Sequence, residues 1–281
     1  MTDPDLTDDF GEGEPLDQLL DLLDLEQIEE NLFRGVSPPE SRQRVFGGQV
    51  AAQALVAATR TIEDKGVHSL HAYFLRPGDP SRPIVYDVDR IRDGRSYATR
   101  RVVGIQAGQA IFNLQASFHC GGELGYEHQA DPPTGVPDPE SVDPGSWRRV
   151  AAARGFLETV RPIETRLVPN PGRLSRYMWM RANGKLGDDP TLHCCVAAYA
   201  SDLSLLPTAL LPHGFPEAFP AMMASLDHAM WFHRHFRADE WMLYEQESPA
   251  ALDGRAFCWG RIWTREGSLA MSVAQEGVAR R

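Results

Sequence analysis

The sequence is poor in cysteine, and its cysteines are not arranged for a metal site or a disulfide framework. The 281 residues include only Cys120, Cys194, Cys195 and Cys258, with no Cys-x-x-Cys pair among them. This pattern argues against structural zinc and is typical of reduced thiols. We therefore expect a cytoplasmic protein with free cysteines.

Several other signatures are absent as well. No uncharged apolar run approaches the ~18 residues of a membrane-spanning helix, and the N-terminus lacks the basic and apolar parts of a signal peptide. There is no Gly-x-Ser-x-Gly nucleophile elbow, no P-loop and no dinucleotide fingerprint. These absences argue against a membrane span, against the serine hydrolases that use that elbow, and against nucleotide-dependent redox or kinase chemistry. We expect no cofactor.

Basic residues are missing from the start of the chain, and this accounts for the overall charge. Residues 1–30 contain twelve Asp or Glu and no Lys or Arg. The net charge of −11 is thus carried by this segment, and the remaining 251 residues sum to +1. A nearly neutral body does not repel an anionic ligand. The Lys and Arg residues are scattered rather than gathered in a stripe, so we expect no nucleic-acid partner.

The first half of the chain predicts an acidic tail, two helices and four strands. Residues 1–14 are acidic and poor in apolar side chains, which predicts disorder. Helical apolar spacing predicts helices over residues 16–31 and 47–59. Strand-like runs follow over residues 67–76, 84–92, 96–106 and 109–119. We expect an N-terminal domain over residues 15–120.

A similar order of elements follows a Gly/Pro-rich linker, which we place at residues 121–150. A helix is predicted over residues 191–203. Strands are predicted over residues 156–168, 173–182, 224–235, 240–248, 255–264 and 268–279. We expect a C-terminal domain over residues 151–281.

Short similar motifs in the two halves suggest a diverged duplication. His71-Ala72-Tyr73-Phe74 is similar to His228-Ala229-Met230-Trp231, and Asp93-Gly94-Arg95 returns as Asp253-Gly254-Arg255, at separations of 157 and 160 residues. A helix and about four antiparallel strands in each half predict an α+β fold with a curved sheet around a buried helix, twice over. The apolar circumference of the helix at 47–59 agrees with enclosure by a sheet.

Two polar residues stand on rows that are otherwise apolar. Asp202 follows Cys195 by seven residues on the stripe of the second long helix, and Gln275 continues the row of Leu269, Met271 and Val273. A buried ionised Asp needs donors or a functional reason, and a Gln amide can hold a carboxylate or a water. The structural alternative for Asp202 is a capping or salt-bridged residue near the helix end. The structural alternative for Gln275 is that its strand has simply reached solvent. The position in the first half that corresponds to Gln275 is Ala116.

The run at 224–235 is rich in polar side chains, including Ser225, Asp227, His228 and His233. The two histidines are five residues apart and face opposite sides of a strand, and no His-Glu-x-x-His motif accompanies them. We therefore expect no metal. Apolar neighbours could line an acyl tunnel or form ordinary core. These neighbours are Met222, Met223, Met230, Trp231 and Phe232.

Taken in order, these motifs resemble the acyl-CoA thioesterase II family across residues 15–281. The motifs are Phe46-Gly47-Gly48-Gln49, His71-Ala72-Tyr73-Phe74, Asp93-Gly94-Arg95-Ser96, Ser201-Asp202, the run from Asp227 to Arg234, and Gln275-Glu276-Gly277. The resemblance implies a double hotdog fold, two antiparallel sheets each wrapped around a long central helix. It also implies hydrolysis of acyl-CoA to fatty acid and CoA, no metal, and assembly into a homo-oligomer through the hotdog sheets.

The resemblance also implies catalytic positions at Asp202, Ser225 and Gln275. The family carries Thr at the hydroxyl position, whereas this chain has Ser225, which keeps the hydroxyl but loses the β-methyl that restricts its rotamers. Asp202 would accept a proton from a water that Gln275 and Ser225 position beside the thioester. Attack by Ser225 itself is an open alternative. So are a non-catalytic acyl-CoA-binding or regulatory protein and an enoyl-CoA hydratase.

Overall fold

The computed structural model describes residues 14–38, 44–146, 162–169, 172, 174–214 and 222–280. The predicted disordered tail therefore lies outside the described residues up to position 13, as do residues 147–161 between the two halves. The described helices are α1 (Glu14–Leu23), α2 (Gly47–Thr59) and α4 (Pro190–Ser201), with 3-10 helices η1 (Pro139–Ser141) and η3 (Leu206–His213).

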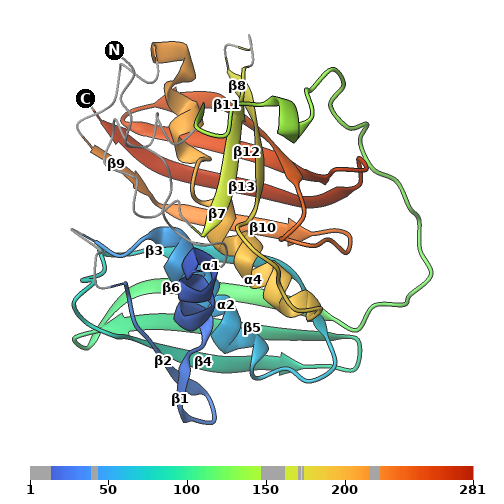
Figure 1. Ribbon diagram of the computed structural model, residues 1–281. Helices are drawn as coiled ribbons and strands as arrows, with labels where there is room; N and C mark the ends of the chain where they lie inside the picture. The colour runs from blue at the N-terminus through green and yellow to red at the C-terminus, as the bar shows by residue number, and fades with distance from the viewer. Residues whose placement is uncertain are drawn as a thin grey trace.

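The strands form one continuous antiparallel sheet, in which the halves of the chain mirror each other (Figure 1). The order is β1-β2-β4-β5-β6-β3-β10-β13-β12-β11-β8-β7, with β9 paired to β13. The first-half strands are β1 (Glu26–Glu29), β2 (Leu32–Gly35), β3 (Gly66–Phe74), β4 (Ile84–Asp93), β5 (Tyr97–Gln106) and β6 (Gln109–His119). The second-half strands are β7 (Ile163–Val168), β8 (Ser175–Ala182), β9 (Met222–Ser225), β10 (Asp227–Phe232), β11 (Met242–Leu252), β12 (Arg255–Thr264) and β13 (Leu269–Arg280). Pairing of β3 with β10 joins the two halves.

The two central helices pack against each other inside the curled sheet. Most residues of α2 and of α4 are buried, as the apolar circumference predicted for the first of them. Figure 1 shows α4 crossing the middle of the molecule between the two groups of strands. Glycine permits the close approach, because a Cβ at Gly48 would lie 2.5 Å from the carbonyl oxygen of Tyr199. A central helix in each half, wrapped by antiparallel strands, confirms the predicted double hotdog fold.

The register of the sheet corrects the alignment of the similar motifs at His71 and His228. His71 pairs with Ala229 and Ala72 with His228 across β3 and β10. Ala72 and His228 are buried, whereas His71 faces outward, so the matching histidines lie on opposite faces of the sheet. A one-residue slip reverses the face of every side chain. Ala72 pairs with Leu114 of β6 and Met230 pairs with Val273 of β13, two positions that correspond when Ala116 corresponds to Gln275. Ala72 therefore matches Met230 in the structure, whereas the sequence motifs align it with Ala229.

The first hairpin was missed by the helix prediction over residues 16–31. The helix α1 ends at Leu23, and β1 and β2 follow. Ile28, which lies inside the predicted helix, is 46% exposed, whereas Phe33 of β2 is fully buried. Pairing of β2 with β4 extends the sheet around α2, and this tertiary contact outweighs the local helical preference.

The connection between the halves is extended and anchored to the C-terminal half. It leaves β6 and runs along one side of the molecule, shown in green in Figure 1. Gln129 donates to the carbonyl oxygen of Gly267 at 2.9 Å, and the Trp179 indole donates to the carbonyl oxygen of Pro137 at 2.9 Å. Glu140 accepts two hydrogen bonds from the Arg265 guanidinium.

One described segment, Pro190–His213, has the length and hydropathy of a membrane-spanning helix, with 24 residues and a mean hydropathy of 1.5. Its most apolar part is 72% buried inside the protein, because the segment consists of α4, η3 and the four residues between them. The core helix of a soluble protein has the same properties, so the segment is weak evidence for a membrane span.

Candidate active site

Asp202 stands where α4 ends. The helix begins with Asp189, whose side chain accepts a hydrogen bond from the Thr191 N–H, and with Pro190 in its first turn. Asp202 is the C-cap residue; the residue as a whole is partly exposed, whereas its carboxyl group is buried. A carboxylate at a helix C-terminus gains nothing from the helix dipole, which favours cations there. The usual capping explanation therefore does not account for Asp202.

The structure brings the three predicted site residues into contact. Gln275 of β13, which is fully buried, donates from Nε2 to Oδ1 of Asp202 at 2.6 Å and to Oγ of Ser225 at 2.9 Å. The Ser225 hydroxyl at the end of β9 lies 3.4 Å from the same Oδ1 and donates to it. Gln275 is thus on the inner face of its strand, as the alternation predicted. The catalytic roles of these residues stay a prediction.

The first half of the chain contributes the start of α2 to the same site. The backbone N–H of Gly48 donates to Asp202. A Cβ at Gly47 would lie 2.7 Å from Oδ2 of Asp202 and 3.0 Å from the ring of Phe74. Sequence reasoning used this glycine pair as the start of a helix and as part of a family motif, but did not place it in the site. Two adjacent glycines at the beginning of an apolar helix were the available signal that another group approaches closely there.

Burial and hydrogen bonding act in opposite directions on Asp202. Removal from water raises the pKa of its carboxyl from 3.8 to about 6, and this effect exceeds the lowering by the donors Gln275, Gly48 and Ser225. The group is mostly ionised at neutral pH, yet it is more basic than an exposed aspartate. A carboxylate in this state suits general-base chemistry.

The Gln275 amide has one acceptor left. Its Nε2 hydrogens are directed at Asp202 and Ser225, and its Oε1 is buried without a hydrogen-bond partner among the described residues. The opposite amide orientation would place Oε1 against the Asp202 carboxylate, so these contacts fix the orientation. The free acceptor can hold a hydroxyl or a water beside the carboxylate.

The histidines of β10 and its C-terminal end do not converge on a common point. His228 is buried, and its Nε2 lies 2.8 Å from Oγ of Ser201. His233 is exposed and lies 2.9 Å from Oγ of Ser272. Met230, weighed as part of an acyl tunnel, belongs to the core, whereas Met223, two residues before Ser225, is half-buried.

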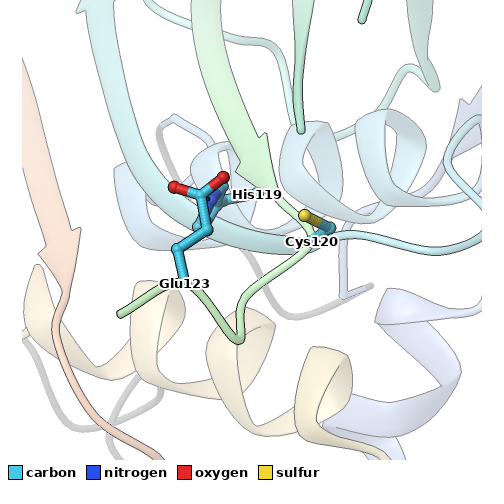
Figure 2. A group of neighbouring side chains, drawn as sticks. All are labelled: His119, Cys120 and Glu123. Carbon is cyan, nitrogen blue, oxygen red and sulfur yellow. Dashed lines mark ion pairs between the residues drawn. The ribbon is translucent and has the colours of Figure 1, made fainter. Parts of the chain in front are cut away.

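A separate group at the end of β6 offers potential metal ligands (Figure 2). Ligand atoms of His119, Cys120 and Glu123 lie within 4.8 Å of one another. However, Nδ1 of His119 accepts a hydrogen bond from the Gly121 N–H, so a neutral ring carries its proton on Nε2, which lies 3.6 Å from the Glu123 carboxylate. In that tautomer neither ring nitrogen offers a free lone pair to a metal, because Nδ1 already accepts a hydrogen bond and Nε2 carries the proton.

The sequence matches two family models that together cover most of the chain. A model described as acyl-CoA thioesterase matches residues 155–278, and one described as acyl-CoA thioesterase N-terminal domain matches residues 37–119. Both matched ranges contain residues of the site. The first covers Asp202, Ser225 and Gln275, and the second covers Gly47 and Gly48.

Individual relatives match over nearly the whole chain. Acyl-coenzyme A thioesterase 8 of Homo sapiens is 45% identical, covering 92% of this chain and 88% of the relative. Acyl-CoA thioesterase 2 of Haemophilus influenzae is 38% identical, and the match covers 94% of this chain and 98% of the relative. The crystal structure of an acyl-CoA thioesterase II from Mycobacterium marinum has 43% sequence identity and a TM-score of 0.81, covering 93% of this chain and 98% of that chain.

Proposed function

Because this chain belongs to the acyl-CoA thioesterase family, we propose that Asp202, Ser225 and Gln275 activate the water that hydrolyses its substrate. The protein is a thioester hydrolase that converts acyl-CoA to free fatty acid and CoA. The observation that carries the site assignment is the contact of all three side chains at one place, with a buried carboxylate whose pKa is raised to about 6.

The chemistry begins with a water held by Asp202 and Gln275. Asp202 accepts a proton from this water as the oxygen attacks the thioester carbonyl. The tetrahedral intermediate then expels the CoA thiolate, and the proton returns to the sulfur, leaving the free acid. Gln275 aligns the carboxylate through Nε2 and offers Oε1 to the water, while Ser225 holds the other hydrogen of the amide in place.

The start of α2 supplies positive potential for the oxyanion. Phe46, the N-cap residue, gives no side-chain hydrogen bond to the first N–H groups of this thirteen-residue helix. Gly48 uses its N–H on Asp202, and the helix N-terminus carries partial positive charge. We place the thioester carbonyl beside these fixed dipoles, where they would stabilise the negative charge that develops as the water attacks.

The direct test is release of free thiol from acyl-CoA by the purified protein, measured over a series of chain lengths. Turnover supports the proposal, and saturable acyl-CoA binding without thiol release would replace it with the binding-protein alternative. Loss of enoyl absorbance from enoyl-CoA without thiol release would select the hydratase alternative.

We expect the pH dependence of kcat/KM to follow the ionisation of Asp202. Because burial raises the pKa of this carboxyl to about 6, activity should rise with pH through a midpoint near 6 and be lost below it. The measurement is a pH–rate profile at limiting substrate. A midpoint near 3.8, the ordinary value for an aspartate, would contradict the buried general base.

Replacement of Ser225 by alanine should separate water attack from attack by the serine. If Ser225 only holds the Gln275 amide, S225A should lower kcat by about tenfold, the loss of one neutral hydrogen bond worth ~1 kcal/mol or slightly more. Steady-state kinetics and a search for a burst of thiol release decide between them. Complete loss of activity together with a wild-type burst would favour an acyl-enzyme on Ser225.

Three further assignments stay proposals. We propose domains at residues 15–120 and 151–281 with a linker at 121–150, supported by the mirrored strand order. We propose a cytoplasmic location, supported by four free cysteines. We propose a homo-oligomer through the outer sheet face, where Tyr73 is 57% exposed and the His71 and Trp231 rings stack edge to face at 5.2 Å.

A further inference from the structure

The segment from Ser225 to His228 contacts the neighbours of both other site residues. Ser225 itself bonds to Gln275, Asp227 bonds to the residue after Gln275, and His228 bonds to the residue before Asp202. We propose that Asp227 and His228 are positioning residues that hold Gln275 and Asp202 in their reactive geometry. This inference rests on the proposed function of the site.

A β-bulge makes this double contact possible. Ser225 lies opposite Gly277 and Ala229 lies opposite Ala274, so four steps along β9 and β10 face three steps along β13. In a regular strand, Ser225 and His228 would face opposite sides because they are three residues apart. The extra residue turns both side chains toward the core, and bulges commonly aim side chains in this way beside active sites.

The backbone of the bulge is fixed from both sides. The N–H of Leu226 donates to the carbonyl oxygen of Glu276 at 2.9 Å, and its carbonyl oxygen accepts from the N–H of Phe74 at 2.9 Å. The first bond ties the bulge to β13, and the second ties it to β3 in the other half of the chain. The side chains on either side of Leu226 are therefore presented from a rigid frame.

Asp227 acts on Gln275 through the backbone of β13. Its Oδ1 accepts a hydrogen bond from the N–H of Glu276 at 2.7 Å. Between Gly277 and Ala274, the bulge interrupts the regular ladder, so the Asp227 carboxylate satisfies a backbone donor that the partner strand does not. Glu276 directly follows Gln275, so this bond fixes the backbone from which the fully buried Gln275 side chain projects.

His228 acts on Asp202 through the end of α4. Its Nε2 lies 2.8 Å from Oγ of Ser201, whose hydroxyl also donates to the carbonyl oxygen of Ala198. Since the serine hydrogen is used within the helix, the imidazole Nε2–H donates to Ser201. This bond joins β10 to the last turn of α4, directly before the Asp202 carboxylate.

Stability alone does not explain a histidine at this position. His228 is 1% exposed, burial lowers its pKa to about 4, and its Nδ1 has no hydrogen-bond partner among the described residues. A neutral imidazole with a buried, unbonded nitrogen is less favourable than an apolar side chain of similar size. The bond to Ser201 is the feature that an apolar residue could not provide.

Matched substitutions separate the hydrogen bonds from the bulk of the side chains. In D227A and H228L the proposed bonds are lost, whereas in D227N the amide oxygen can still accept from Glu276, and in H228Q the amide nitrogen reaches the place of Nε2. H228N is the shape-matched control, since its shorter amide does not reach Ser201. Each variant is compared with wild type for kcat, KM and melting temperature.

We expect D227A, H228L and H228N to lose about 10- to 100-fold in kcat with KM little changed, the loss that a small displacement of reacting groups produces. D227N and H228Q should retain most of the wild-type kcat, and H228L should melt no lower than wild type. Should H228L not fold, the comparison of H228Q with H228N decides the role of His228.

Wild-type kcat in D227A and H228N would overturn the inference, as would equal losses in each conservative variant and its disruptive partner. Wild-type protein that releases no thiol from acyl-CoA would instead overturn the proposed function. The two failures are therefore distinguishable in one set of assays.

Discussion

Replacement of Asp202 by asparagine should lower the rate of thiol release from acyl-CoA by about 10²- to 10⁴-fold, the range that a general base contributes. Asparagine keeps the shape of the side chain but cannot accept the proton of the attacking water. The loss should appear in kcat, because the proton transfer takes place only as the water attacks. The measurement is steady-state thiol release by D202N beside wild type.

Stability measurements provide the control for D202N. The pKa of Asp202 in the folded protein, about 6, lies above its ordinary value of 3.8, so the favourable contribution of the protonated form is fully present below 3.8 and lost as pH rises through 6. Asparagine is neutral throughout this range, so D202N should be at least as stable as wild type at neutral pH. Undiminished turnover by a folded D202N would remove Asp202 from the mechanism.

Substitution of alanine for Gly48 should damage both the fold and the site. The new Cβ would lie 2.5 Å from the carbonyl oxygen of Tyr199 and 2.5 Å from the Phe46 ring. Backbone cannot move aside as a flexible side chain can, so α2 and α4 must separate. We expect a loss of about 1–3 kcal/mol in the free energy of unfolding. We also expect a roughly 100-fold loss in kcat as the Gly48 N–H moves away from Asp202.

The control for this substitution is Gly66 at the start of β3, where a Cβ would meet nothing within 4 Å. G66A tests the general effect of replacing a glycine by alanine without the contact between the helices. Equal effects of G48A and G66A on kcat would show that the approach of α2 to α4 does not matter for activity. The measurements are denaturant unfolding and steady-state kinetics of both variants.

Regular elements were predictable because their signals are local. The predicted strand over residues 109–119 matches β6, and the predicted helix over 47–59 matches α2, since alternation and helical spacing report burial directly. The same logic placed Gln275 on the inner face of β13. Asp202 was also found in this way, as a carboxylate on an apolar stripe.

The features that the sequence did not reveal depend on contacts between distant segments. The predicted strand over residues 224–235 is interrupted by a bulge at Leu226, and only the pairing of β9 and β10 with β13 reveals it. The approach of Gly48 to Asp202 joins residues from opposite halves of the chain. Neither contact leaves a periodic signal, so pattern analysis could not place them.

The contact of α2 with Asp202 makes the two hotdog units unequal partners. The unit that carries Ala116 where its counterpart carries Gln275 has Arg60, not a carboxylate, at the end of its central helix. It retains instead a glycine pair that serves the carboxylate of the other unit. If Asp202 is the general base, both units contribute to one reaction centre, and we expect neither unit to be active when expressed alone.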